Sequence, residues 1–177
     1  MRWRPIAGQP SSPSTPESCA ELDEQLRAWP DHRQGMREWL QSVSGIEDCI
    51  AEGLLRTRRS EDWSMFERYA LAAFHHPSRA YTEVVCEVLA RRDDDVNNED
   101  LVDTLAEIAD PQSVDCLREA WRWDPPWDEF GQLARKAVWA LAAIGTPEAM
   151  AVVREAADDE RDKPREAAIY KLRRAGS

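Results

Sequence analysis

The sequence predicts an all-α fold, an α-solenoid in which antiparallel helix pairs stack side by side. Apolar residues recur every three or four positions along most of the 177-residue chain, and no stretch alternates with a period of two over the length of a strand. The chain also resembles itself at intervals of 34–36 residues, which is the length of one helix pair in a solenoid. Each pair leaves an apolar face uncovered, so neighbouring pairs are expected to stack.

A segment rich in Pro and Ser comes first. Residues 1–18 contain few large apolar side chains, so they cannot bury enough surface to offset the entropy of ordering, and we predict a flexible lead. We predict one helical domain over residues 19–177, with N-terminal helices at 19–59 and repeats at 60–177.

Three looser helices are expected before the repeats, at 20–29, 33–43 and 46–56, each with apolar residues at helical spacing. Pro30 ends the first of them, because proline cannot continue a helix. Ser60 is expected to cap the N-terminus of the next helix, since a serine hydroxyl accepts a hydrogen bond from an unpaired backbone N–H there.

Two segments carry the repeat most clearly. Leu105–Ala120 reads LAEIADPQSVDCLREA, and Leu141–Ala156, 36 residues later, reads LAAIGTPEAMAVVREA. Each unit is read as an apolar A helix, a short turn, a proline and a B helix. Proline suits the first helical position, where its missing N–H would have been unpaired anyway. Gly145 suits the left-handed end of the preceding helix, and Pro77 is expected to open the helix that runs to about residue 91.

This pattern closely resembles HEAT-like repeats of the short bacterial kind, which also occur in phycobilin lyases. The resemblance covers about residues 63–176. It implies a solenoid of about three to four helix pairs and says little of function, because such repeats serve as scaffolds, inhibitors, lyases and repair glycosylases. The motif residues are Leu141, Ile144, Gly145, Pro147, Ala149 and Val153, echoed by Leu105, Ile108, Pro111, Ser113 and Leu117.

The charge and composition exclude several classes of function. The net charge is −11, and residues 61–177 hold 25 acidic and 15 basic residues, which argues against nucleic acid as the main partner. No apolar run approaches the length of a membrane helix, and no secretory signal is apparent. The dominance of Arg over Lys is typical of a GC-rich, bacterial genome. The four cysteines form no CxxC motif and are expected to be buried free thiols in a reducing cytoplasm.

Acidic residues recur on one face of the predicted B helices. Gln112, Asp115, Glu119 and Arg122 follow a helical spacing, and the next B helix repeats it 36 residues later. Stacked, the two helices are expected to form a mostly acidic strip. The strip is either a docking surface for a basic protein or simply a solvated face.

The most unusual segment is the Trp-rich loop, residues 121–128, in which three tryptophans surround a Pro-Pro turn. Tryptophan is enriched in binding hot spots, but we expect at least one of the three to belong to the core. In the alternative interpretation, Trp121 ends the core face of its B helix and Trp127 caps the next helix pair. The candidate partner-binding residues of the strip and the loop are Asp115, Glu119, Trp121, Trp123, Asp124, Trp127, Asp128, Glu148, Glu155 and Asp158.

No metal site, cofactor site or catalytic constellation is predicted. Residues 93–104 place oxygen ligands as a calcium loop does, but Asn98 stands where the loop needs Gly and Thr104 where it needs Glu. A solvated loop is the simpler interpretation, with Asn97 or Asn98 capping the next helix.

Three functions remain after these observations. The first is a non-enzymatic module that binds a basic partner protein, such as an immunity protein that inhibits a bacterial toxin. The alternative is a lyase, isomerase or ligand-binding protein that uses the concave groove, which would need convergent polar groups in an apolar pocket. The third is a structural scaffold subunit.

Overall fold

The computed structural model describes residues 15–29 and 33–175, and its described residues contain helices and no strand. The all-α class predicted from the sequence is therefore confirmed. Short 3-10 turns at Arg79–Tyr81 and Pro111–Ser113 lead into two of the helices. The α-helices are α1 (Cys19–Ala28), α2 (Arg33–Leu40), α3 (Glu47–Ser60), α4 (Trp63–His75), α5 (Thr82–Arg91), α6 (Asn98–Ile108), α7 (Val114–Arg122), α8 (Gln132–Ile144), α9 (Pro147–Ala156) and α10 (Asp162–Ala175).

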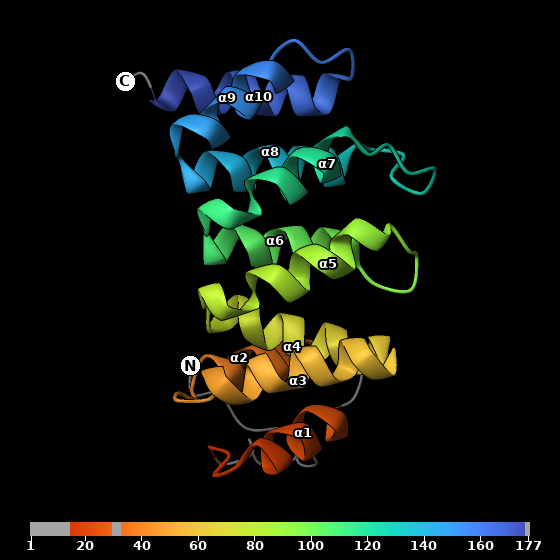
Figure 1. Cartoon of the computed structure of the whole chain (residues 1–177), viewed down its shortest axis with the longest axis vertical. Helices are drawn as coiled ribbons and strands as arrows, with labels where there is room; N and C mark the ends of the chain where they lie inside the picture. The colour runs from red at the N-terminus through yellow and green to blue at the C-terminus, as the bar shows by residue number, and fades with distance from the viewer. Residues whose placement is uncertain (1–14, 30–32, 176–177) are drawn as a thin grey trace, which may run out of the picture.

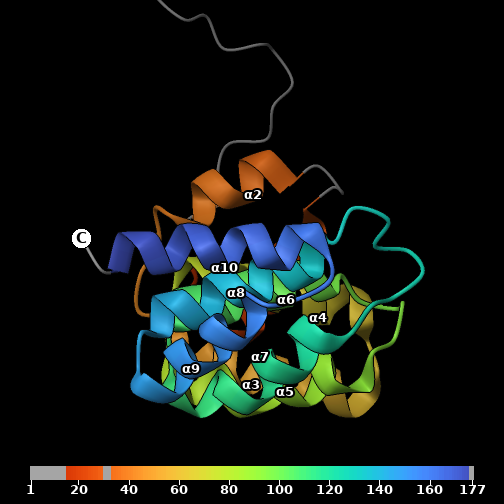
Figure 2. The ribbon, with the colours of Figure 1, turned by 90° about the horizontal axis from the view of Figure 1, so that it is seen from above.

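The helices form two layers of a stack (Figures 1 and 2). Helices α4, α6, α8 and α10 follow one another in the A layer, and α3, α5, α7 and α9 follow one another in the B layer. Helix α1 packs against α3 and α4 at the N-terminal end. The loops that lead from each B helix to the next A helix all emerge at one edge of the stack (Figure 1), which we call the loop edge.

A single apolar core runs between the two layers. The repeat residues fill it as predicted: Leu105 and Leu141 are fully buried on the A helices, and Leu117 and Val153 are fully buried on the B helices. Asp110 is buried with them, where its carboxylate accepts a hydrogen bond of 2.8 Å from Thr82 on the preceding repeat. Such a bond satisfies two buried polar groups at once.

The turn between A and B helices has the chemistry that the sequence predicted. Helix α8 ends at Gly145 in the left-handed region, with φ of +68°, and the Thr146 hydroxyl then accepts a hydrogen bond from the Ala149 N–H to cap α9. The equivalent turn one repeat earlier has Ala109 at φ of +50°. An alanine Cβ is crowded in this conformation, whereas glycine adopts it freely.

We expect opposite effects from exchanging the two residues. Gly145→Ala should lower the free energy of unfolding by about 1 kcal/mol, because the left-handed conformation is unfavourable for a residue with a Cβ. Ala109→Gly should raise it by about 0.5 kcal/mol, since the relief exceeds the added entropy of the unfolded chain. Urea unfolding of both variants measures the effects, and the same sign for both would contradict the assignment of equivalent turns.

Two predicted helix starts are wrong. Ser60 belongs to the last turn of α3, because Glu61 adopts a left-handed conformation and ends that helix. The cap of α4 is instead Asp62, whose carboxylate accepts a hydrogen bond from the Met65 N–H. Pro77 lies before the following 3-10 turn rather than in a helix, and the cap there is the Ser78 hydroxyl. The predicted cap at Asn97 is confirmed by its bond from the Asp100 N–H.

The prediction of free thiols is contradicted. Cys19 on α1 is bonded to Cys49 on α3, and Cys86 on α5 is bonded to Cys116 on α7, each pair 30 residues apart. A separation near the repeat length places the two cysteines of each pair on helices that pack against each other, and no local sequence motif signals such a pair. Disulfides persist mainly in oxidising compartments, so the inference of a reducing cytoplasm loses its basis.

Residues 1–14 of the predicted lead lie outside the described residues, and at its end Ser18 caps α1 with a bond from the Glu21 N–H. None of the helices in the described ranges combines the length and hydropathy that crossing a bilayer requires.

Candidate functional site

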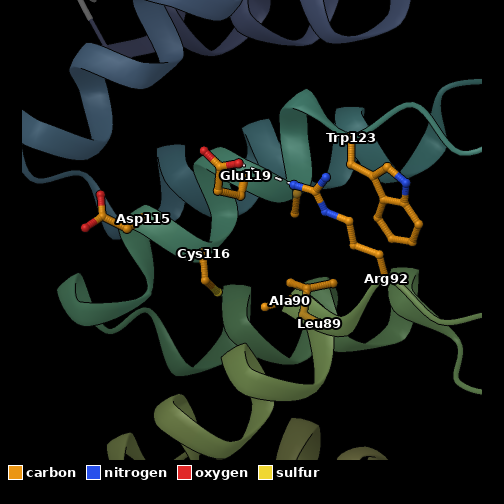
Figure 3. Close-up of a pocket in the computed structure, with 8 residues that line it drawn as sticks. Leu89, Ala90, Arg92, Asp115, Cys116, Glu119 and Trp123 are labelled. Atoms are coloured by element: carbon orange, nitrogen blue, oxygen red, sulfur yellow. Dashed lines mark hydrogen bonds and ion pairs between the residues drawn. The ribbon is translucent and has the colours of Figure 1, made fainter.

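A pocket of about 310 Å³ opens on the B layer between α5 and α7. Figure 3 shows Arg92 and Trp123 at one end of it and Asp115 at the other, with Glu119 above. The surface between them is apolar. We call this the α5–α7 pocket, and it is lined by Leu89, Ala90, Arg92, Asp115, Cys116, Glu119, Ala120 and Trp123.

The ends of the two B helices position its polar residues. Arg92 follows α5 in the left-handed region, with φ of +57°, and its N–H bonds the Leu89 carbonyl. Trp123 follows α7 in an extended conformation, with its N–H bonded to the carbonyls of Glu119 and Ala120. These turns bring the Arg92 guanidinium to 5.9 Å from the centre of the Trp123 ring and 3.3 Å from a Glu119 oxygen.

The Arg92–Glu119 pair is one of three equivalent ion pairs, which together we call the ion-pair ladder. Each pair joins the end of one B helix to a carboxylate on the next. The N–O distances are 3.0 Å for Arg58 with Glu87, 3.3 Å for Arg92 with Glu119 and 2.6 Å for Arg122 with Glu155.

The ladder changes the charge of the predicted acidic strip. The hydrogen bond that Arg122 donates to the Glu155 carboxylate raises the pKa of Arg122, which also lies 3.5 Å from Glu119. Asp115 is likewise paired, with Arg118 at 2.5 Å. Single exposed pairs contribute little to stability, but here they pair the central carboxylates of the strip with arginines. Arginines therefore lie among the central carboxylates of the strip and pair with them.

A second pocket, of about 450 Å³, lies at the loop edge. It is formed by the loop that precedes α6 and by Trp127 from the Trp-rich loop. We call it the loop-edge pocket, and it is lined by Asp94, Val96, Asn97, Asn98, Glu99 and Trp127.

Hydrogen bonds hold the wall of the loop-edge pocket in place. The Asn98 amide donates to the carbonyls of Asp93 and Val96, at 2.8 and 3.2 Å. The Asn97 N–H donates to the carboxylate of Glu67 on α4 at 2.7 Å. Asn98 is only 1% exposed, and its Oδ1 has no hydrogen-bond partner.

Trp123 and Trp127 connect the two pockets. Their rings meet edge to face, with centroids 5.8 Å apart, which is a favoured arrangement of aromatic pairs. Because Trp123 lines the α5–α7 pocket and Trp127 lines the loop-edge pocket, the two pockets share one aromatic wall.

The structure separates the ten predicted binding residues. Asp115, Glu119 and Trp123 line the α5–α7 pocket, and Trp127 lines the loop-edge pocket. Asp124 is exposed between them, 3.7 Å from Arg161. The remaining residues line neither pocket; Glu148, Glu155 and Asp158 are exposed on α9 and just after it.

Two of the predicted residues have structural roles instead. Trp121 is 4% exposed and belongs to the core, which confirms that one of the three tryptophans is internal. Asp128 caps α8, because its carboxylate accepts hydrogen bonds of 2.7 and 2.9 Å from the N–H groups of Gln132 and Leu133. Trp121 is buried, whereas Asp128 remains half-buried at the start of α8.

Sequence reasoning missed the arginines and the loop-edge pocket. Arg58, Arg92 and Arg122 recur near the end of successive B helices, and that recurrence was a signal for the ladder. No sequence signal joins residues 94–99 to Trp127, because stacking of neighbouring repeats brings them together. Within the described residues no group of three or more His, Cys, Asp or Glu is arranged to hold a metal ion.

The two-layer stack of helix pairs defines an α-solenoid. The family model that describes HEAT repeats matches residues 82–173, more than half of the chain. The chain therefore belongs to the HEAT-repeat family, whose repeats commonly mediate protein–protein interaction and generally serve in binding or scaffolding. A comparison with curated proteins finds no match.

Proposed function

We propose that this chain is a non-enzymatic module that binds a basic partner protein on the surface formed by its two pockets. The observation that carries the proposal is the Trp123–Trp127 pair, which stands between an apolar pocket and an acidic one. Aromatic side chains beside well-formed pockets dominate the binding energy of protein interfaces. The proposal treats residues 19–177 as one binding domain.

The basic character of the partner is supported by the charge at the loop edge. The ladder pairs the central B-layer carboxylates, whereas Asp94 and Asp95 have no ion-pair partner among the described residues, in a protein with a net charge of −11. Unpaired carboxylates around an aromatic surface accelerate encounter with a cationic protein and select against anionic ones. An inhibitor of a basic enzyme, such as an immunity protein against a toxin, is the form of this function that the charge favours.

The test fills the α5–α7 pocket. Ala90 is exposed at the pocket, so Ala90→Arg places a long side chain in it without disturbing the core. Wild type, Ala90→Arg, Trp123→Ala and the control Ala143→Arg, on an exposed site of α8, are used to capture proteins from the source cells under cross-linking. We expect one basic protein whose recovery falls about tenfold in the first two variants, equivalent to about 1.4 kcal/mol, and is unchanged in the control.

Equal recovery of the same proteins by all four forms would contradict the proposal. It would favour the alternative in which the pocket of this HEAT-repeat protein takes a small ligand, as expected for a lyase or isomerase. Native mass spectrometry of wild type and Ala90→Arg then distinguishes that alternative from a scaffold subunit, because only a ligand-binding protein carries a bound mass that the variant loses.

A further inference from the structure

The loop-edge pocket combines three properties. It has an exposed aromatic wall, a carboxylate (Asp94) without an ion-pair partner among the described residues, and a buried acceptor without a hydrogen-bond partner there. We propose that this pocket binds the guanidinium group of an arginine side chain on the partner protein. The proposal rests on the proposed function, which it extends by naming the group recognised and the residues that recognise it.

The aromatic wall is Trp127, whose side chain is 41% exposed. Four other tryptophan rings have an arginine of the protein beside them: Arg91 lies 4.1 Å from the ring centre of Trp63, and Arg135 lies 4.8 Å from that of Trp139. Trp121 and Trp123 have similar partners, at 5.6 and 5.9 Å. Within the described part of the chain, Trp127 is an exposed indole that no internal cation covers. A guanidinium stacked on it would complete the same cation–π contact.

The negative charge at the pocket comes from the loop that precedes α6. Asp94 has no ion-pair partner among the described residues, and its neighbour Asp95 has none either. The Glu99 carboxylate forms an ion pair with Lys136 Nζ at 3.0 Å, so it adds only part of its charge to the pocket. The pocket therefore has a negative potential that an arginine or lysine of a partner would neutralise.

The acceptor is Asn98 Oδ1. Asn98 lines the pocket and is 1% exposed; its amide N–H groups donate to backbone carbonyls, and its Oδ1 has no hydrogen-bond partner among the described residues. A buried acceptor without a donor carries a desolvation cost that a bound donor removes. The missing partner is therefore a hydrogen-bond donor.

These three properties favour arginine over lysine. A guanidinium is planar, so one face stacks on an indole while its five N–H groups point outward to acceptors in the ring plane. A lysine ammonium is a compact and strongly hydrated charge that gains less from stacking. The pocket offers the indole of Trp127 and the carboxylate of Asp94, which are the kinds of group that a guanidinium contacts.

The test titrates the full-length protein with the blocked pentapeptide Gly-Gly-Arg-Gly-Gly and with its citrulline analogue, which has nearly the same shape but no charge. Binding is followed by NMR through the indole N–H resonance of Trp127, assigned with Trp127→Phe. We expect the arginine peptide to bind at least about tenfold more tightly than the citrulline peptide. We also expect it to bind about threefold more tightly than a third peptide that has lysine in place of arginine.

Substitutions in the protein show where the arginine peptide binds. Trp127→Ala should weaken the arginine peptide about fivefold or more, and Asp94→Asn about threefold. Both residues are at the surface, so the fold is retained, which thermal unfolding confirms. The control Trp139→Ala removes an indole of similar exposure, 39%, that lies outside the pocket and should leave binding unchanged.

Three outcomes would overturn the inference: equal binding of the arginine and citrulline peptides, equal binding of the lysine peptide, or no effect of Trp127→Ala. Its failure is distinguishable from that of the proposed function, because Ala90→Arg changes the other pocket. If the arginine peptide does not bind while Ala90→Arg still abolishes capture of the partner, the proposed function stands and the arginine site does not. If the peptide binds but Trp127→Ala leaves partner capture unchanged, the site does not serve the partner and the inference is also wrong.

Discussion

Replacing Gly53 by alanine is expected to destabilise the protein by about 3 kcal/mol, although alanine is the better helix former by about 1 kcal/mol. Gly53 lies on the buried face of α3, and a Cβ built there would meet Tyr69 Cε1 at 2.2 Å. Such a contact requires either the ring or the helix to move. Urea unfolding, compared with wild type, measures the change.

The ring of Tyr69 cannot yield easily. Tyr69 is 1% exposed, its hydroxyl donates to Asp23 on α1 at 3.1 Å, and it lies 3.3 Å from the Arg56 guanidinium. Burial raises the pKa of Tyr69 from 10.0 to about 12, so the hydroxyl keeps its proton and this role as donor into more alkaline solution than an exposed tyrosine does. Moving the ring would therefore also break the polar contacts that join α1, α3 and α4.

A double-mutant cycle isolates the clash. Tyr69→Ala alone should destabilise the protein, because it leaves a large cavity. In that background Gly53→Ala no longer meets a ring and should be neutral or slightly stabilising. If Gly53→Ala costs the same about 3 kcal/mol with and without Tyr69, the contact between the two residues is not the cause.

Reducing the two disulfides is expected to lower the free energy of unfolding by a large amount as well. Each closes a loop between cysteines 30 residues apart, and a loop of that length is worth about 3–4 kcal/mol through the entropy of the unfolded chain. The Cα–Cα distances of 4.9 and 5.7 Å lie in the usual range for disulfides. The free energy of unfolding in urea, with and without a phosphine reductant, gives the difference.

Paired variants separate the two bonds. Cys19→Ser with Cys49→Ser removes the link between α1 and α3, and Cys86→Ser with Cys116→Ser removes the link between α5 and α7. Each double variant should be destabilised by about half as much as the reductant destabilises wild type. The stability of the variant without any cysteine should not change when the reductant is added. Titration of four free thiols in the denatured, unreduced protein would show that the disulfides do not form.

Helical periodicity predicted the position of some of the candidate binding residues and not of others. Helical spacing correctly placed Asp115 and Glu119 on one exposed face of α7. It also offered Trp121 as the end of the core face, where the residue is buried, but it left open whether Trp121 and Trp123 both belong to the binding surface. The two residues lie on either side of the end of α7, and the direction of the chain after a helix depends on what packs there.

Ion pairs across the predicted strip could not be found from the sequence. Counting along the sequence assigned net acidity to the strip, but an ion pair depends on distances between helices that are 27–33 residues apart in the chain. Arg92 was not considered because it follows its helix rather than lying on it. The left-handed turn after α5 directs it toward Glu119.

The sequence by itself determined the class of fold, the period of the repeat and most of the turn chemistry, because these depend on residues close together in the chain. Leu105 and Leu141 had to be buried at the spacing of one repeat, and Gly145 had to end a helix. The tertiary structure decided which cysteines are bonded and which arginines pair with carboxylates of the strip. It also decided that Trp127 lies against the loop before α6. These are contacts between neighbouring repeats, and their geometry follows from how the helix pairs stack, which no local pattern encodes.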